Sequence, residues 1–284
     1  MTMIEKNLHI TLIIILTRES GNPVLSKSWI PACAGMTIFI MSILKTEAIV
    51  LRSFDFRETS RIATFYTKEY GRVSGILKGI RQDPKKFGSS LDRFSVNDIV
   101  YYQCRNSELH LISHCDMRNY FYPVRQDLKK SIAAHYIMEL VNVIMPTEEK
   151  NAKVYQLMVD FLSALEKTDD INKLIHFFQI KILLISGFKP HLDTCLHCHK
   201  KIGGKARFSL KDGGLICLEC PVADTTVHLI SPGAVASILF AEKNDWTHCL
   251  KLKLTSVTKD ELKYVLNNFL VFHLGRKIKS AKYL

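Results

Sequence analysis

Four cysteines form the most specific chemical pattern in the sequence. Cys195 and Cys198 make one CxxC pair, Cys217 and Cys220 make a second, and 18 residues separate the two pairs. Two residues between cysteines let one tight turn aim both sulfurs at the same ion, so two such pairs match a four-thiolate zinc site. Four thiolates leave no coordination position for water. We therefore expect one structural Zn²⁺ and no metal-based catalysis.

The segment between the two CxxC pairs has to bring them together. Residues 207–216 have the pattern of a strand, an Asp-Gly turn at Asp212-Gly213 and a second strand, which is typical of a β-hairpin. Such a hairpin would return the second pair beside the first. Two redox CxxC pairs or a disulfide pair are the alternatives, but the second pair lacks a thioredoxin-like setting. His197 and His199 could substitute as ligands, although four cysteines suffice.

Positive charge is concentrated early in the chain. The formal net charge is +12, which favours a polyanionic partner, either nucleic acid or an anionic membrane. Ten basic residues lie between positions 52 and 93, against five acidic ones. Neutralisation of phosphates needs such charges, and a solvated basic face without a ligand is the alternative. The residues that we expect to contact nucleic acid are Arg52, Arg57, Arg61, Arg72, Lys78, Arg81, Lys85, Lys86 and Phe87.

Aromatic residues are interleaved with these charges, and exposed rings can stack on the bases of a single strand without sequence preference. We expect most of these rings to lie in the hydrophobic core. Phe87 is the expected exception because it lies in a loop-like segment, residues 78–88, that contains glycines and a proline. A rival location for nucleic acid is a C-terminal basic run that contains no acid: Arg276, Lys277, Lys279 and Lys282.

The elements that would position these residues can be read from hydrophobic periodicity. Five short stretches rich in Val, Ile, Tyr, Phe or Thr predict strands, at residues 46–52, 61–67, 72–77, 98–104 and 108–114. No helical period interrupts them. Five short strands in about 80 residues suit a small closed barrel of the OB type, with an SH3-like barrel as the alternative.

From Pro123 onward the apolar residues recur at spacings of three and four, which predicts amphipathic helices. We expect helices at residues 125–145, 148–167, 170–186, 233–242 and 259–273. His176, on the third of these, is expected to be a core or boundary side chain and not a catalyst. The predicted fold is therefore α+β with two domains, an OB-fold β-barrel at 41–122 and an α-helical domain at 123–284 that carries a four-cysteine zinc finger at 195–220.

The first 40 residues show no sustained period. We expect them to lie outside the fold, as a mis-assigned start or an accessory leader, with Met41 as the true beginning. The alternative is a membrane anchor through residues 10–16. The longest purely apolar run, Leu12–Leu16, is far shorter than the roughly 20 residues of a spanning helix, so we expect no membrane association.

Six segments of the chain, in order, resemble the bacterial RecO family of recombination mediators. They are residues 48–52 (AIVLR), 58–62 (ETSRI), 70–81 (YGRVSGILKGIR), 186–198 (SGFKPHLDTCLHC), 231–233 (SPG) and 273–280 (HLGRKIKS). The resemblance covers the chain from Met41 to its C-terminus, and residues 1–40 have no counterpart in the family pattern.

The resemblance implies an OB fold joined to a helical domain with a zinc finger. It further implies binding of single- and double-stranded DNA, annealing of complementary strands and a partnership with RecR, together with which the protein would help RecA displace the single-stranded-DNA-binding protein SSB. A cytoplasmic, nucleoid-associated protein without enzymatic activity is expected. The sequence contains no GxxxxGK, HExxH or GxSxG motif. A zinc-ribbon RNA-binding or RNA-modification accessory protein is the alternative.

Overall fold

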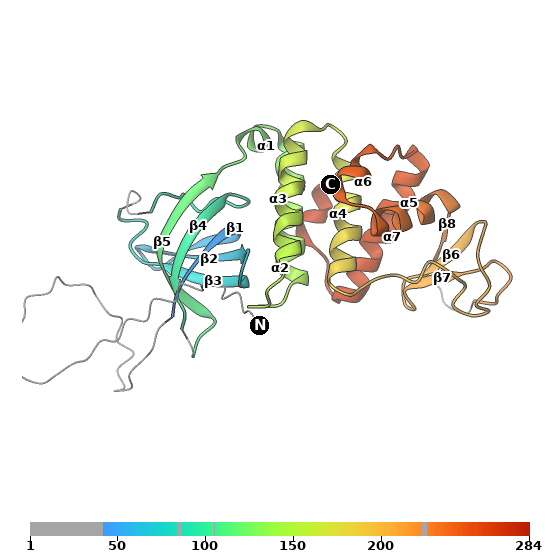
Figure 1. Cartoon of the computed structure of the whole chain (residues 1–284), viewed down its shortest axis with the longest axis horizontal. Helices are drawn as coiled ribbons and strands as arrows, with labels where there is room; N and C mark the ends of the chain where they lie inside the picture. The colour runs from blue at the N-terminus through green and yellow to red at the C-terminus, as the bar shows by residue number, and fades with distance from the viewer. Residues whose placement is uncertain (1–41, 84–86, 105, 223–225) are drawn as a thin grey trace, which may run out of the picture.

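Figure 1 shows the computed structural model of the chain, which describes residues 42–83, 87–104, 106–222 and 226–284. Residues 1–40 and two of the expected DNA contacts, Lys85 and Lys86, lie outside the described residues. The strands are β1 (Ile43–Phe56), β2 (Ser60–Thr67), β3 (Gly71–Leu77), β4 (Val96–Tyr102), β5 (Leu109–Asn119), β6 (Ala206–Ser209), β7 (Gly214–Ile216) and β8 (Val227–Ile230). The helices are α1 (Tyr122–Gln126), α2 (Leu128–Ile144), α3 (Ala152–Lys167), α4 (Ile171–Ile185), α5 (Pro232–Lys243), α6 (Trp246–Lys251), α7 (Ser256–Leu274) and the 3-10 helix η2 (Lys279–Tyr283).

The first five strands close into a barrel in the order β1-β2-β3-β5-β4. β3 and β5 pair in parallel, whereas the other neighbours are antiparallel. Side chains alternate along each strand, so Val73 and Leu77 of β3 point into the barrel while Arg72 and Ile76 lie on its outer face. The predicted OB-type barrel is confirmed, and its first and last strands are longer than expected.

The barrel interior is apolar and includes Phe87, whose side chain is only 4% exposed. The expectation that this ring is exposed is therefore wrong. Phe87 follows the glycine- and proline-containing loop directly, but it packs in the same cluster as Ile80 and Leu91. Burial of a phenyl ring contributes on the order of 2–3 kcal/mol relative to exposure, which favours this inward position.

The helix predicted at 125–145 is present as α2, and the short helix α1, which was not predicted, precedes it. α1 ends at Gln126, and the side chain of Asp127 then accepts hydrogen bonds from the backbone N–H groups of Lys129 (2.8 Å) and Lys130 (3.1 Å). An aspartate in this position is a favourable N-cap, so it starts α2 anew. The other predicted helices are present with small shifts at their ends, and the short helix α6 was not predicted.

The barrel and the helices lie against each other, with the three-stranded sheet of β6, β7 and β8 at the opposite end of the molecule (Figure 1). Outer-face barrel residues such as Leu51 and Tyr66 belong to the same buried cluster as the core of the helices. The approach is close at Gly71, which has a φ of 68°. A Cβ at this position would lie 2.0 Å from the carbonyl oxygen of Glu149, so only glycine fits there.

Among the described residues, no helix is long and apolar enough to cross a membrane.

Candidate metal centre and nucleic-acid interface

The structure brings the four predicted cysteine ligands together at the far end of the molecule. The sulfurs of Cys195 and Cys220 are 3.9 Å apart, those of Cys198 and Cys217 are 3.7 Å apart, and all four lie within 4.8 Å of one another. Zinc–sulfur bonds of about 2.3 Å in a tetrahedron place the sulfurs about 3.8 Å apart. The cluster therefore has the dimensions and the donor set of a four-thiolate zinc site.

The hairpin that was predicted between the two pairs is present. β6 and β7 pair antiparallel, with Ser209 opposite Gly214, and β8 adds a third strand along β6. Leu196 donates its backbone N–H to the carbonyl oxygen of Leu215 at 2.8 Å, which ties the first CxxC turn to β7. This sheet sets the second cysteine pair beside the first.

Backbone N–H groups prepare the sulfurs to carry negative charge. The N–H groups of His197 and Cys217 lie 3.4 Å and 3.3 Å from the Cys195 sulfur. Burial opposes ionisation of Cys195, but hydrogen bonds from the backbone N–H groups of Cys198, Cys217 and His197 outweigh it and lower its pKa to about 6. The hydrogen bonds with Cys217, Cys198 and Cys195 raise the pKa of Cys220. A cation is therefore needed before all four sulfurs can be thiolates together.

Arg207, which lies on β6, stabilises the turn that contains Cys217 and Cys220. Its Nη2 donates to three carbonyl oxygens, those of Cys217 (2.8 Å), Leu218 (2.9 Å) and Cys220 (2.7 Å). Three hydrogen bonds from one planar, charged group fix the path of the turn and hence the direction of its two sulfurs. The sequence pattern predicted the four-cysteine cluster but not this supporting residue.

A candidate nucleic-acid interface lies on the outer face of the barrel at the other end of the molecule. Phe54, Ile62 and Ile76 stand opposite one another on β1, β2 and β3, and Leu111 of β5 continues the row beside Ile76. Phe54 is 46% exposed, and the other three side chains are partly exposed. The result is an apolar row across four strands with an accessible ring at its end.

A polar row runs alongside this apolar row. Arg52 is paired with Thr64, which is paired with Ser74, and Arg52 Nε donates to Thr64 Oγ1 at 3.2 Å. The Arg52 guanidinium lies 5.9 Å from the centre of the Phe54 ring, within range of a cation–π contact. An exposed ring thus stands next to an exposed positive charge, the combination that contacts single-stranded nucleic acid.

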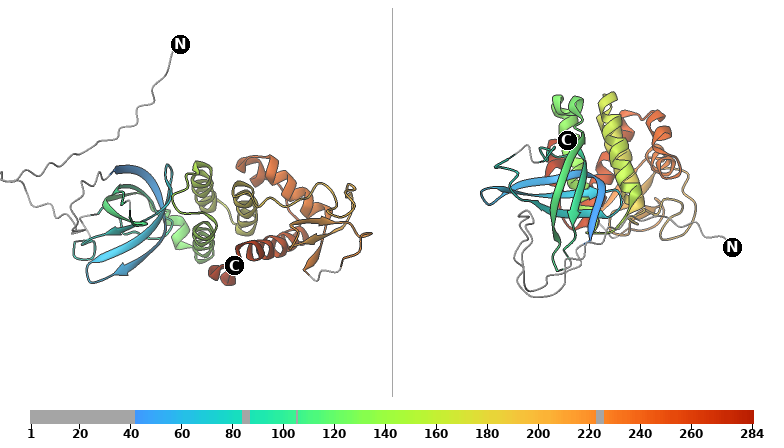
Figure 2. Two further views of the ribbon diagram at one scale, coloured as in Figure 1. Left: turned by 90° about the horizontal axis from the view of Figure 1, so that it is seen from below. Right: turned by 60° about the vertical axis from the view of Figure 1, so that its left-hand side comes forward.

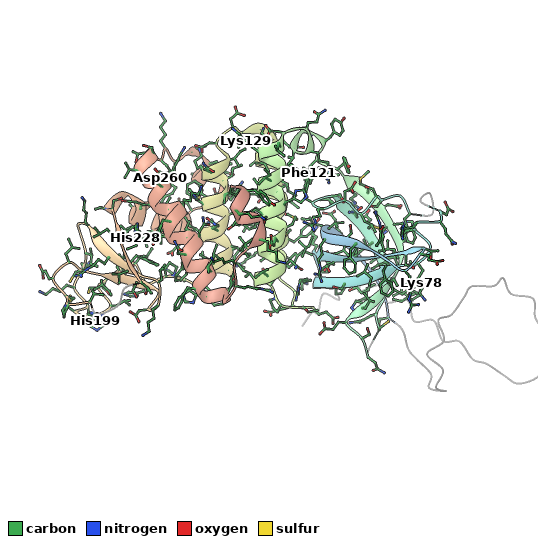
Figure 3. All side chains as sticks on the ribbon, turned by 180° about the vertical axis from the view of Figure 1, so that it is seen from behind. Lys78, Phe121, Lys129, His199, His228 and Asp260 are labelled. Carbon is green, nitrogen blue, oxygen red and sulfur yellow. The ribbon has the colours of Figure 1, made fainter. Side chains whose placement is uncertain are left out.

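The remaining predicted contacts form a separate group at the β1–β2 turn. Asp55 accepts from Arg61 Nε at 2.8 Å and is 3.5 Å from Arg81 Nε, while Arg81 also donates to the carbonyl oxygen of Arg57 at 3.0 Å. The hydrogen bond from Arg61, with Arg81 nearby, lowers the pKa of Asp55. Two of the three arginines here are thus partly neutralised. Lys78 is exposed at the end of β3, on the opposite end of the molecule from His199 of the zinc module (Figure 3).

Arg72 occupies a different environment from the one predicted. Its Nη1 donates to the carbonyl oxygen of Asn142 at 3.1 Å and its Nη2 to Thr147 Oγ1 at 2.7 Å. Burial first, and then repulsion from Arg52, lower the pKa of this group. Arg72 therefore joins the barrel to the helical part, and its donors are largely used within the protein.

The ring best placed for stacking on this face was misassigned from the sequence. Phe87, the expected candidate, lies in the barrel core, whereas Phe54 is exposed on the outer face. Strand alternation alone could not have identified Phe54, because alternation continued from Ala48 and Val50 would place it inside the barrel. A bulge between Val50 and Arg52 shifts the pattern by one residue and turns Phe54 to the outer face. His176 is buried within α4, as predicted.

Comparisons with known proteins agree with this architecture. The family model described as "Recombination protein O N terminal" matches residues 41–121, and the one described as "Recombination protein O C terminal" matches residues 125–282. The curated DNA repair protein RecO of Syntrophus aciditrophicus is 28% identical over 245 residues, covering 84% of this chain and 94% of that protein. The DNA repair protein RecO of Alkaliphilus metalliredigens is 29% identical over 235 residues, covering 82% of this chain and 95% of that protein.

Proposed function

The chain belongs to the RecO family of DNA repair proteins, and we propose that it is a non-catalytic mediator that binds single-stranded DNA on the outer face of its barrel. Phe54 carries the proposal. Its ring is 46% exposed at the end of an apolar cross-strand row, with the Arg52 guanidinium beside it. A base can stack on the ring while the arginine meets the neighbouring phosphate.

The basic residues around this face supply the affinity. Within the described part of the chain, Arg52, Arg57 and Lys78 form no ion pair, so their charges are available to phosphates. Arg61 and Arg81 share Asp55 and would exchange it for phosphate on binding. Lys85 and Lys86 lie outside the described residues, and Phe87 lies in the barrel core. We therefore assign the stacking role to Phe54.

Binding of this kind recognises the backbone and the faces of the bases, so it tolerates changes of sequence. A surface with this property can hold two different strands in succession, which fits annealing of complementary strands. Double-stranded DNA would use the phosphate contacts alone and bind less tightly. The same proposal includes RecR and SSB as partners, with RecA acting downstream, and a cytoplasmic, nucleoid-associated location. Membership of the RecO family supports this part of the proposal.

One zinc ion at Cys195, Cys198, Cys217 and Cys220 completes the proposal as a structural cofactor. The four sulfurs match a tetrahedral thiolate site in distance and in type. Bound zinc would neutralise the thiolates and hold the CxxC turns against the β6–β7 hairpin. Four protein ligands leave no position for substrate, so the ion would supply stability and no chemistry.

The experiment that tests this proposal compares two matched phenylalanines. Phe54 is 46% exposed on the barrel, and Phe272 is 47% exposed on α7. Phe54→Ala should weaken binding of an oligothymidylate by about 1 kcal/mol or more, with a smaller effect on duplex DNA, while Phe272→Ala leaves both unchanged. Fluorescence anisotropy on the full chain measures this directly.

Two outcomes of that experiment, and one of a separate RNA–DNA competition, would contradict the proposal. Equal losses for Phe54→Ala and Phe272→Ala would place the ring contact elsewhere. Unchanged binding by Phe54→Ala would remove the stacking role. Tighter binding of a matched single-stranded RNA than of DNA, measured in competition, would favour the RNA-binding accessory protein instead.

A further inference from the structure

Two arginines from distant parts of the chain meet at the last turn of α2. Arg72 on β3 donates to the carbonyl oxygen of Asn142 at 3.1 Å, and Arg276 donates to the carbonyl oxygen of Val143 at 3.5 Å. The C-terminal end of a helix carries unpaired carbonyl groups and partial negative charge, so it attracts cations. The end of α2 thereby brings the C-terminal segment, residues 275–284, next to the barrel.

The C-terminal segment is held in this place by one carboxylate. α7 ends at Gly275, whose φ of 63° lets the chain turn back. Glu139 on α2 then accepts from the backbone N–H groups of Lys279 (2.7 Å) and Ser280 (2.9 Å) and from Ser280 Oγ (2.5 Å). These bonds dock η2 along α2, and Figure 2 shows the C-terminus beside the helices that adjoin the barrel.

Positive charge is left unmatched on this segment. Residues 275–284 contain no acidic side chain, and within the described residues none of the four basic side chains of the segment forms an ion pair. The four are exposed: Arg276, Lys277, Lys279 and Lys282.

Charges of the barrel and of the C-terminal segment both act on Arg72 between them. Burial lowers the pKa of Arg72 most, the positive charge of Arg52 lowers it further, Glu108 raises it, and Arg276 lowers it again. Arg52 lies in the polar row of the barrel face, and Arg276 lies across the domain junction from it. Like charges gathered in this way repel one another, and a polyanion laid across them removes that repulsion.

We propose that the C-terminal segment is the second half of the DNA-binding surface, with Arg276 and Lys277 contacting phosphates of the same strand that stacks on Phe54. The inference rests on the proposed function, since it extends the barrel face. The barrel and the C-terminal run are then two parts of one continuous surface. Glu139 is a positioning residue, because it holds the segment in place without reaching the DNA.

The test removes two charges from the segment and compares the effect with a matched pair elsewhere. Arg276→Ala with Lys277→Ala is set against Lys205→Ala with Lys211→Ala, two exposed lysines of the zinc module at the far end of the molecule. Binding of single-stranded DNA by the full chain is measured at several salt concentrations. The log–log salt slope should decrease by about 1.4 for the C-terminal pair, at about 0.7 per phosphate contact, and should not change for the zinc-module pair.

A second variant tests the positioning role. Glu139→Ala removes the acceptor of the η2 backbone and leaves every basic residue in place, so it should speed hydrogen exchange at Lys279 and Ser280 in the free protein. The salt slope should decrease as well, and bound DNA should restore part of the protection. A slope that stays unchanged while exchange accelerates would overturn the positioning role.

The outcomes separate this inference from the function on which it rests. If the Arg52→Ala and Phe54→Ala variants lose binding while the Arg276/Lys277 pair keeps the full salt slope, DNA binds to the barrel alone and the C-terminal inference is wrong. If the barrel variants also keep full binding, the proposed function fails too. Equal decreases for the C-terminal and zinc-module pairs would reflect net charge alone and would overturn the inference.

Discussion

Arg72 on β3 donates a hydrogen bond of 2.7 Å from its Nη2 to Oγ1 of Thr147, in the turn between α2 and α3. Together with its bond to the carbonyl oxygen of Asn142, this contact fastens the barrel to the helices. A charged group that looked like a phosphate ligand in the sequence therefore has a structural role.

Arg72→Ala should lower the free energy of unfolding by about 2 kcal/mol, because it removes charge-assisted hydrogen bonds from partly buried partners. Arg52→Ala, at an exposed position, should change it by less than about 0.5 kcal/mol. Chemical denaturation followed by circular dichroism measures both. For DNA binding we expect the reverse. Arg52→Ala should reduce the log–log salt slope of binding, and Arg72→Lys, which keeps the positive charge, should not. A reduced slope for Arg72→Lys would mean that Arg72 contacts phosphate after all.

Zinc content offers a second test, centred on Arg207. Purified protein should contain about one zinc per chain, and Cys195→Ser with Cys198→Ser should abolish it and lower the melting temperature. Arg207→Met keeps all four ligands but loses three hydrogen bonds to the second cysteine turn. We expect it to weaken zinc affinity by about 10–100-fold, the usual range for a supporting residue around a metal.

The control for the zinc measurements is Cys249→Ala, which removes a buried cysteine outside the cluster. This variant should keep its zinc. A protein that is purified under reducing conditions without chelator and contains no zinc would contradict the assignment.

The comparison of sequence and structure shows which features local patterns encode. The barrel strands, the β6–β7 hairpin and the clustering of the four cysteines were predictable, because alternation, an Asp-Gly turn and cysteine spacing are all local signals. Asp127 shows a local signal that was overlooked, since an N-cap residue near the start of the predicted helix at 125–145 begins α2 at Leu128 and leaves α1 as a separate short helix.

Long-range contacts decide the environments of Phe87 and Arg72, which the sequence did not indicate. Phe87 has loop-like neighbours in sequence, yet it packs with Leu91 and the barrel strands. Arg72 has the charge of a DNA contact, but its partners Asn142 and Thr147 lie about 70 residues further along the chain. No pattern within a strand or a loop specifies such partners, so only the folded arrangement could assign these two residues.

Acid should destabilise the protein partly through His176 on α4. The ring is buried and its Nδ1 lacks a hydrogen-bond partner among the described residues. Burial, aided by the positive charge of Lys263 and Lys259 and opposed by Asp170, lowers its pKa from 6.5 to about 4. The folded pKa lies below the unfolded one, so the full stability is present above pH 6.5. It then falls as the pH drops from 6.5 to about 4, by up to about 3 kcal/mol, at about 1.4 kcal/mol per pKa unit.

His176→Gln should flatten the dependence of the unfolding free energy on pH within this window, as measured by urea denaturation between pH 4 and pH 7. An identical pH dependence in the wild type and in His176→Gln would show that other groups govern the acid sensitivity.

Leucine substitutions at Phe54 and Phe87 separate a stacking ring from a core ring. Leucine retains apolar volume but has no π-face for a base. At Phe87, which is 4% exposed inside the barrel, leucine should cost about 1 kcal/mol of stability and leave the affinity for single-stranded DNA intact. At Phe54, which is 46% exposed, leucine should leave stability unchanged and weaken binding by about 1 kcal/mol or more, while Phe54→Trp keeps it.

The pair of measurements is informative because the two variants should fail in different assays. Thermal melting should respond at Phe87 and anisotropy at Phe54, so a general loss of folded protein cannot imitate the result. If the Phe87→Leu variant has a normal melting temperature but binds DNA poorly, the Phe87 ring must leave the barrel core to contact the DNA strand. If the Phe54→Leu variant binds DNA as well as the wild type, the apolar row on β1, β2, β3 and β5 does not contact the bases. The DNA-binding interface would then lie on another face.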